Sequence, residues 1–149
     1  MTRTIAPASA DAVLASLELL AARGEDPTER VYERLFVLHP VYRARFAREG
    51  DDAVKGAMLA RTITAMLDFL GDPDAGGYDL ATEMVTHEGY DIPRDVFSGF
   101  FDVVRDVARD TLADDWTGDF ETGWADLVAA IETHLGDRLP SDVDFTHRG

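Results

Sequence analysis

Residues 51–73 read DDAVKGAMLARTITAMLDFLGDP, and this stretch has the pattern of a long amphipathic helix. Asp51 and Asp52 are residues that often begin helices, and Gly71-Asp72-Pro73 is a typical stop. The apolar side chains between them recur at three- and four-residue spacing: Val54, Met58, Leu59, Ile63, Met66, Leu67 and Leu70. Since this spacing gathers them on one face, the stretch predicts a helix that buries that face against the rest of the protein.

The same helical spacing covers most of the chain, and no alternating pattern of convincing length predicts a strand. The further helices are predicted at about residues 10–23, after Asp26-Pro27 up to His39-Pro40, over 80–87, from Pro93 to Leu112, and at about 119–136. Residues 72–77 are glycine-rich and polar, so a loop is predicted there. The fold class predicted from these patterns is all-α.

The composition limits the classes of protein and cofactor that the chain can represent. Its 149 residues correspond to one domain with room for a single cofactor pocket. The absence of cysteine excludes disulfides, thiolate metal sites, iron–sulfur clusters and haem attached through thioethers. No apolar run has the length of a signal-peptide core or a membrane span, so we expect a cytoplasmic protein with no membrane partner.

The charge of the chain is strongly negative. It has 29 acidic and 14 basic residues, for a formal net charge of −15. Such a surface repels phosphate backbones and anionic lipid head groups, which makes nucleic acids and membranes poor partners. Lys55 is the single lysine among the basic residues.

Two segments carry a resemblance to a known family. Residues 31–46 read VYERLFVLHPVYRARF, and residues 87–93 read HEGYDIP. In residue type, order and spacing they resemble bacterial single-domain globins, as does a tryptophan, Trp124, in the predicted last helix. The resemblance covers about residues 9–136. It implies a single globin-like domain over residues 1–149, with helices packed as a two-layer sandwich and a short polar tail at 137–149.

The resemblance also implies a site for haem b, iron protoporphyrin IX, held without covalent attachment. His87 would be the axial ligand of the iron, and Tyr32 would donate a hydrogen bond to a bound gas. Further positions would wall the pocket or flank the ring: Phe46, Lys55, Leu59, Ile92 and Phe97.

Taken one at a time, these residues also have ordinary structural interpretations. His87 alone could be a polar residue at a helix end, and Tyr32 a buried tyrosine bonded to a backbone carbonyl. Phe46 and Leu59 could equally belong to the core. His87 differs from the other three histidines because apolar stripes flank it on both sides; His39 is expected at a corner or on the surface, and His134 and His147 in solvent.

Two residues depart from the family pattern. A lysine is unusual at the position of Lys55, where its stem could lie over the haem edge, its amine could ligate iron, or its charge could stabilise a bound anion. Glu83 lies one turn before His87, where a free buried carboxylate would be costly. Either the short helix turns Leu80 and Met84 toward the ring, or Glu83 forms a hydrogen bond with the imidazole.

The function implied by the resemblance is reversible binding of dioxygen or nitric oxide, with nitric oxide dioxygenation or gas sensing as extensions. The chain has no glycine-rich dinucleotide motif, so turnover as an enzyme would require a separate reductase. A homodimer is one form that such a protein could take. The alternative is a globin-fold interaction or sensory module without haem, whose pocket is filled by side chains or by an apolar ligand.

Overall fold

A computed structural model of the chain describes residues 5–24, 26–44, 52–89 and 92–146, with the backbone alone for 52–54 and 137–146. All regular structure in these residues is helical, which confirms the predicted all-α class. The elements are α1 (Pro7–Ala22), α2 (Thr28–Leu38), α4 (Asp52–Gly71), α5 (Pro73–Glu88), α6 (Arg94–Leu112), the short 3-10 helix η1 (Ala113–Asp115) and α7 (Gly118–Thr146).

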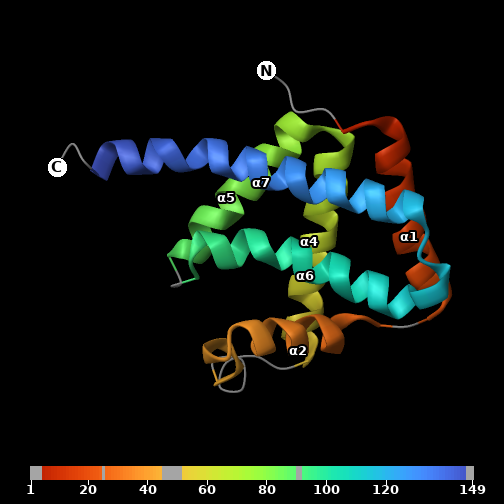
Figure 1. Cartoon of the computed structure of the whole chain (residues 1–149). Helices are drawn as coiled ribbons and strands as arrows, with labels where there is room; N and C mark the ends of the chain where they lie inside the picture. The colour runs from red at the N-terminus through yellow and green to blue at the C-terminus, as the bar shows by residue number, and fades with distance from the viewer. Residues whose placement is uncertain (1–4, 25, 45–51, 90–91, 147–149) are drawn as a thin grey trace.

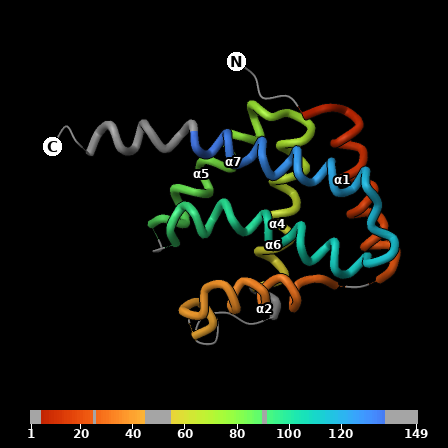
Figure 2. Tube along the Cα trace, viewed as in Figure 1, coloured from red at the N-terminus to blue at the C-terminus, as the bar shows by residue number. Residues whose placement is uncertain are grey.

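The helices pack in crossed directions (Figures 1 and 2). α6 and α7 run antiparallel and contact each other, with η1 and the residues that follow it as the connection. α1 packs against α7. α2 packs against α6, on the side of α6 away from α7 in Figure 1. α4 and α5 contact each other at one end and then diverge, as Figure 1 shows in yellow and green. No helix in the described ranges is both long and apolar enough to cross a membrane.

A buried hydrogen bond joins α1 to α7. The indole Nε1 of Trp124 donates to Oγ of Ser16 at 2.8 Å, and both side chains are fully buried. Oγ of Ser16 in turn donates to the carbonyl oxygen of Val13 at 2.7 Å. The polar groups of this contact therefore have partners, as burial away from water requires.

The close approach of α4 and α5 depends on Gly76. A Cβ atom at this position would lie 2.5 Å from the backbone nitrogen of Phe69, which no real Cβ tolerates. Phe69 itself is fully buried, so its backbone cannot move without disturbing the core. Glycine is therefore required at the point where the two helices meet.

The sequence prediction of a loop at residues 72–77 is wrong, because α5 begins at Pro73. The side chain of Asp72 accepts hydrogen bonds from the backbone nitrogens of Asp74 and Ala75, and Pro73 occupies the first helical position. These features start a helix, and the glycines that suggested a loop serve close packing instead. α5 is consequently twice the length expected from residues 80–87.

Other boundaries are close to those predicted. α1 begins a few residues earlier than expected, α4 matches its predicted bounds, and α6 begins one residue after Pro93. In α2, Pro27 is the cap and the helix begins at Thr28, whose backbone nitrogen and hydroxyl both donate to Asp26 Oδ1.

The C-terminal region differs from its prediction as a polar tail, since helical backbone continues through residue 146. Leu135 is the last buried residue among those of α7 whose side chains are described. Once a helix is nucleated, each further residue adds one backbone hydrogen bond at little additional cost. Extension of the helix past its predicted end is consistent with that cooperativity.

We expect Gly76→Ala to lower the free energy of unfolding by about 1–3 kcal/mol, because the new methyl group overlaps backbone atoms of Phe69. The matched control is Gly99→Ala in α6, where a Cβ has no atom within 4 Å and alanine favours the helix. Urea denaturation followed by circular dichroism measures both. Equal stability of the two variants would contradict the proposed packing constraint.

Candidate ligand cavity

A cavity of about 910 Å³ lies among α2, α4, α5 and α6. Its volume is within the range of about 300–1,000 Å³ that is usual for small-molecule and cofactor sites. Aromatic and aliphatic side chains from the start of α6 and the residues before it form much of the wall: Ile92, Val96, Phe97, Phe100 and Phe101. The cavity is therefore mainly apolar on this side.

His87 lines the cavity from the last turn of α5. Its Nδ1 lies 2.8 Å from the carbonyl oxygen of Glu83. A carbonyl only accepts hydrogen bonds, so Nδ1 carries a proton, and in the neutral form of the imidazole the lone pair is on Nε2. The ring of Phe97 packs against the imidazole, with their centroids 5.0 Å apart. The hydrogen bond and this ring contact restrict the orientation of the imidazole.

Tyr32 lines the cavity from α2 and is 2% exposed. Its ring packs between those of Phe36 and Phe100, at centroid distances of 6.2 and 5.8 Å. Burial raises the pKa of Tyr32 to about 12, because the phenolate form would lose its hydration. The hydroxyl therefore keeps its proton at physiological pH and can act as a hydrogen-bond donor.

The structure brings together four of the residues predicted from the sequence: Tyr32, His87, Ile92 and Phe97 all line the cavity. Phe46 lies outside the described residues.

Lys55 and Leu59 are not among the lining residues. Nζ of Lys55 lies 3.9 Å from Oε2 of Glu29, and Leu59 is buried in the core at 3% exposure. α4 presents Met58, Thr62 and Ala65 to the cavity instead. These residues follow helical spacing on a face next to the predicted one, and only tertiary packing decides which of two neighbouring faces is turned inward.

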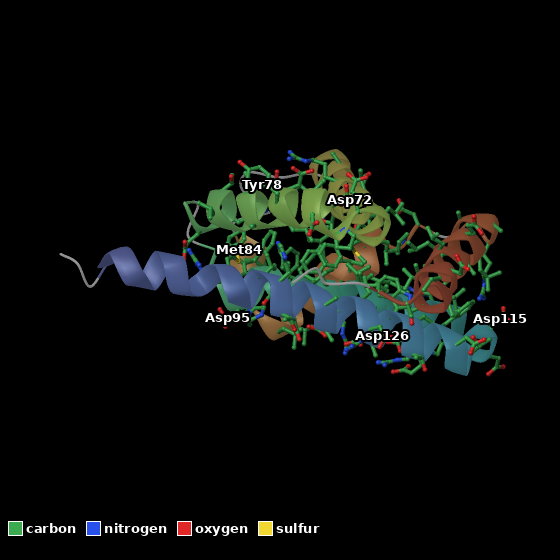
Figure 3. The ribbon with its side chains drawn as sticks, turned by 90° about the horizontal axis from the view of Figure 1, so that it is seen from above. Asp72, Tyr78, Met84, Asp95, Asp115 and Asp126 are labelled. Carbon is green, nitrogen blue, oxygen red and sulfur yellow. The ribbon has the colours of Figure 1, made fainter. Side chains whose placement is uncertain are left out.

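The sequence offered two arrangements around Glu83: Leu80 and Met84 turned toward the ring, or a hydrogen bond from Glu83 to the imidazole. The structure matches each of them only in part. Leu80 lines the cavity, whereas Met84 is buried and lies between α5 and α7, in contrast to the exposed Tyr78 (Figure 3). The backbone carbonyl of Glu83 binds His87, while its carboxylate pairs with Arg61 on α4 at 2.8 Å. Because the carboxylate is paired, its position at the cavity is not costly.

Arg61 and Tyr42 are two of the lining residues that sequence reasoning missed. Arg61 could have been noticed, because it is the one basic residue besides Lys55 in the stretch 51–73. Tyr42 is buried, and its ring contacts that of His39 at 6.2 Å. Nothing in its local sequence distinguishes it from a core aromatic residue.

The polar side of the cavity is rich in hydrogen-bond acceptors. The hydroxyls of Thr62, Thr82 and Thr86 donate to carbonyl oxygens one turn earlier in their own helices, at 2.9–3.0 Å. Their oxygen lone pairs are what they can still offer to a ligand. Three carboxylates, those of Asp68, Asp79 and Glu83, also line the cavity.

The expectation that His134 is in solvent is wrong. Its ring is half-buried, lies 5.9 Å from that of Phe69, and covers Gly77, where a Cβ would approach Nε2 to 2.5 Å. Nε2 is buried without a hydrogen-bond partner among the described residues. His39 is half-buried at the end of α2, and His147 lies outside the described part.

Within the described residues, no group of three or more histidine, aspartate and glutamate side chains is arranged to hold a metal ion. Neither a protein-family model nor a curated protein matches the chain.

We expect ionisation of Tyr32 to destabilise the fold in alkali. The pKa in the folded state, about 12, is above the ordinary value of 10. The stabilisation is therefore complete below pH 10 and is lost as pH rises toward 12, by about 3 kcal/mol in total. Urea unfolding at pH 9 and pH 11.5 measures this loss.

Tyr32→Phe should lose less stability than the wild type over this interval, because it has no buried phenol to ionise. Tyr78→Phe is the matched control, since Tyr78 is 65% exposed and should follow the wild type. If the wild type and Tyr32→Phe lose the same stability, burial of the phenol does not govern the alkaline transition.

Proposed function

We propose that the chain is a globin-fold protein that binds haem b in this cavity, with His87 as the axial ligand, and that it binds dioxygen or nitric oxide. The observation that carries the proposal is the meeting of His87 and Tyr32 in one mainly apolar cavity, with Nδ1 of His87 bonded to a carbonyl. Haem requires only one strong protein ligand, and a neutral imidazole with a free Nε2 lone pair has the right chemistry.

The aromatic lining of the cavity also supports a flat aromatic ligand. Phe97 and Phe101 pack edge to face at 5.8 Å, and Phe97 also contacts His87, so they form a continuous aromatic wall beside the imidazole. When bound, haem b would supply a redox-active iron that coordinates diatomic gases. The chain's own residues would supply orientation and exclusion of water.

Tyr32 is the candidate for selecting the gas. A neutral phenol can donate a hydrogen bond to an electronegative atom in the cavity, and its burial strengthens that bond by excluding competing water. Such a bond favours a partly anionic ligand and slows its release. Nitric oxide dioxygenation would in addition need electrons from a separate reductase.

A second candidate function is that of a haem-free sensory or interaction module. The specific observation in its favour is the acceptor-rich polar side of the cavity, whose lining includes three carboxylates and one guanidinium, that of Arg61. This composition suits an apolar ligand with a neutral or cationic end. The two functions are distinguished by absorption spectroscopy: a Soret band that shifts with carbon monoxide supports the haem protein, and colourless protein after haem reconstitution rejects it.

We expect His87→Ala to abolish stable haem uptake, because it removes the axial nitrogen while leaving the rest of the cavity intact. His39→Ala is the matched control, since His39 does not line the cavity. Titration of each apoprotein with haemin, followed at the Soret band, measures uptake. Near-normal binding by His87→Ala would assign the ligand to another residue.

We also expect Tyr32→Phe to release dioxygen roughly tenfold faster or more, the effect of losing a hydrogen bond to a partly charged ligand. Stopped-flow measurement of the ferrous oxygenated protein gives this rate. Tyr42→Phe serves for comparison, because Tyr42 is the other phenol in the lining residues described. Faster release in Tyr42→Phe alone would transfer the donor role from Tyr32 to Tyr42.

A further inference from the structure

Arg61 and Glu83 form an ion pair across the cavity lining, from α4 to α5. Nη2 of Arg61 lies 2.8 Å from Oε2 of Glu83, and both residues line the cavity. The side chain of Arg61 is 73% exposed and that of Glu83 is 35% exposed. Exposed ion pairs contribute little to stability, so this pair can separate at small cost.

The charges around the pair leave Arg61 as the basic group of the described lining that an anionic ligand could meet. Asp68, Asp79 and Glu83 oppose a single guanidinium, so the described lining has a charge of minus two with His87 neutral. A ligand that carries carboxylates would be repelled unless a basic group met them. Arg61 is the basic side chain of the lining. Its guanidinium has five N–H donors and uses one of them in the hydrogen bond to Glu83, so the others could bind a ligand.

Glu83 has a second group within reach. Its Oε1 lies 3.9 Å from Nδ1 of His87, while the backbone carbonyl of the same residue holds that nitrogen at 2.8 Å. A carboxylate is a stronger acceptor than a neutral carbonyl, by roughly twofold in energy. While Arg61 pairs with the Glu83 carboxylate, the backbone carbonyl of Glu83 keeps the hydrogen bond from Nδ1 of His87. If Arg61 released the carboxylate, the carboxylate could replace the carbonyl as the acceptor.

We propose that Arg61 changes partners when an anionic ligand enters the cavity: the guanidinium moves from Glu83 to a carboxylate of the ligand, and the released Glu83 carboxylate accepts the hydrogen bond from Nδ1 of His87. The inference rests on the proposed haem binding, because haem b carries two propionate carboxylates. Arg61 is then an anchoring residue and Glu83 a positioning residue. Binding of a ligand carboxylate to Arg61 is thereby coupled to the basicity of the His87 imidazole.

The first half of the proposal is tested by the loss of haem to an excess of a competing apoglobin. Arg61→Gln should lose haem b about two- to fivefold faster than the wild type, the effect of one exposed ion pair. It should lose haem dimethyl ester, which has no free carboxylates, at the wild-type rate. Arg43→Gln is the matched control, since Arg43 is exposed, pairs with Glu33 at 3.0 Å and lies outside the lining.

The second half is tested by the reduction potential of the loaded protein. Glu83→Gln should shift the potential upward with haem b, because an amide is a weaker acceptor and leaves the imidazole less basic. With the dimethyl ester the wild-type Arg61 stays on Glu83, so the same substitution should shift the potential less than it does with haem b.

The outcomes separate this inference from the function on which it rests. Equal acceleration of loss with both porphyrins would mean that Arg61 has only a structural role, and it would overturn the exchange while haem binding stands. Equal shifts of potential with both porphyrins would overturn the transfer to Glu83. Failure of the wild-type protein to bind either porphyrin would overturn the proposed function and the exchange together.

Discussion

The contact between α4 and α5 at Gly76 is the constraint on which the candidate site depends. Because the backbone of α5 meets that of Phe69 directly, the two helices are held together at one end. They diverge from this point (Figure 1), and α2 and α6 complete the wall of the cavity between them. A side chain at position 76 would separate the helices at the end where they are in contact. The geometry of the site therefore depends on glycine at this position.

The divergence places different chemistry on the two sides of one cavity. α2 and α6 contribute aromatic and aliphatic side chains, whereas α4 and α5 contribute threonines, carboxylates and Arg61 together with apolar residues such as Met58 and Leu80. The polar residues satisfy much of their hydrogen bonding locally, through carbonyls of their own helices or through the Arg61–Glu83 pair. Such local satisfaction allows polar groups to border an apolar cavity without the penalty of unpaired burial.

The boundaries of the helices illustrate where reasoning from sequence succeeds and where it fails. α4 was predictable because its apolar spacing is long and its ends carry clear signals, Asp52 at the start and Gly71 at the end. The start of α5 was not, because glycines at 76 and 77 have the same local signature whether they form a loop or permit close packing. His134 was misjudged for the same reason: the ring covers Gly77, a contact between residues far apart in the chain.

Local sequence by itself determined the all-α class and the order of most helices, because propensity, spacing and capping act over a few residues. The choice of Tyr32, His87, Ile92 and Phe97 as site residues came from the family resemblance. Tertiary packing decided which of these side chains share a cavity, and it excluded Lys55 and Leu59 in favour of Met58 and Thr62 on the neighbouring face. It also paired Arg61 with Glu83. The reason is that neighbouring faces of a helix differ by a rotation of one residue, and only the fit of the surrounding helices sets that rotation.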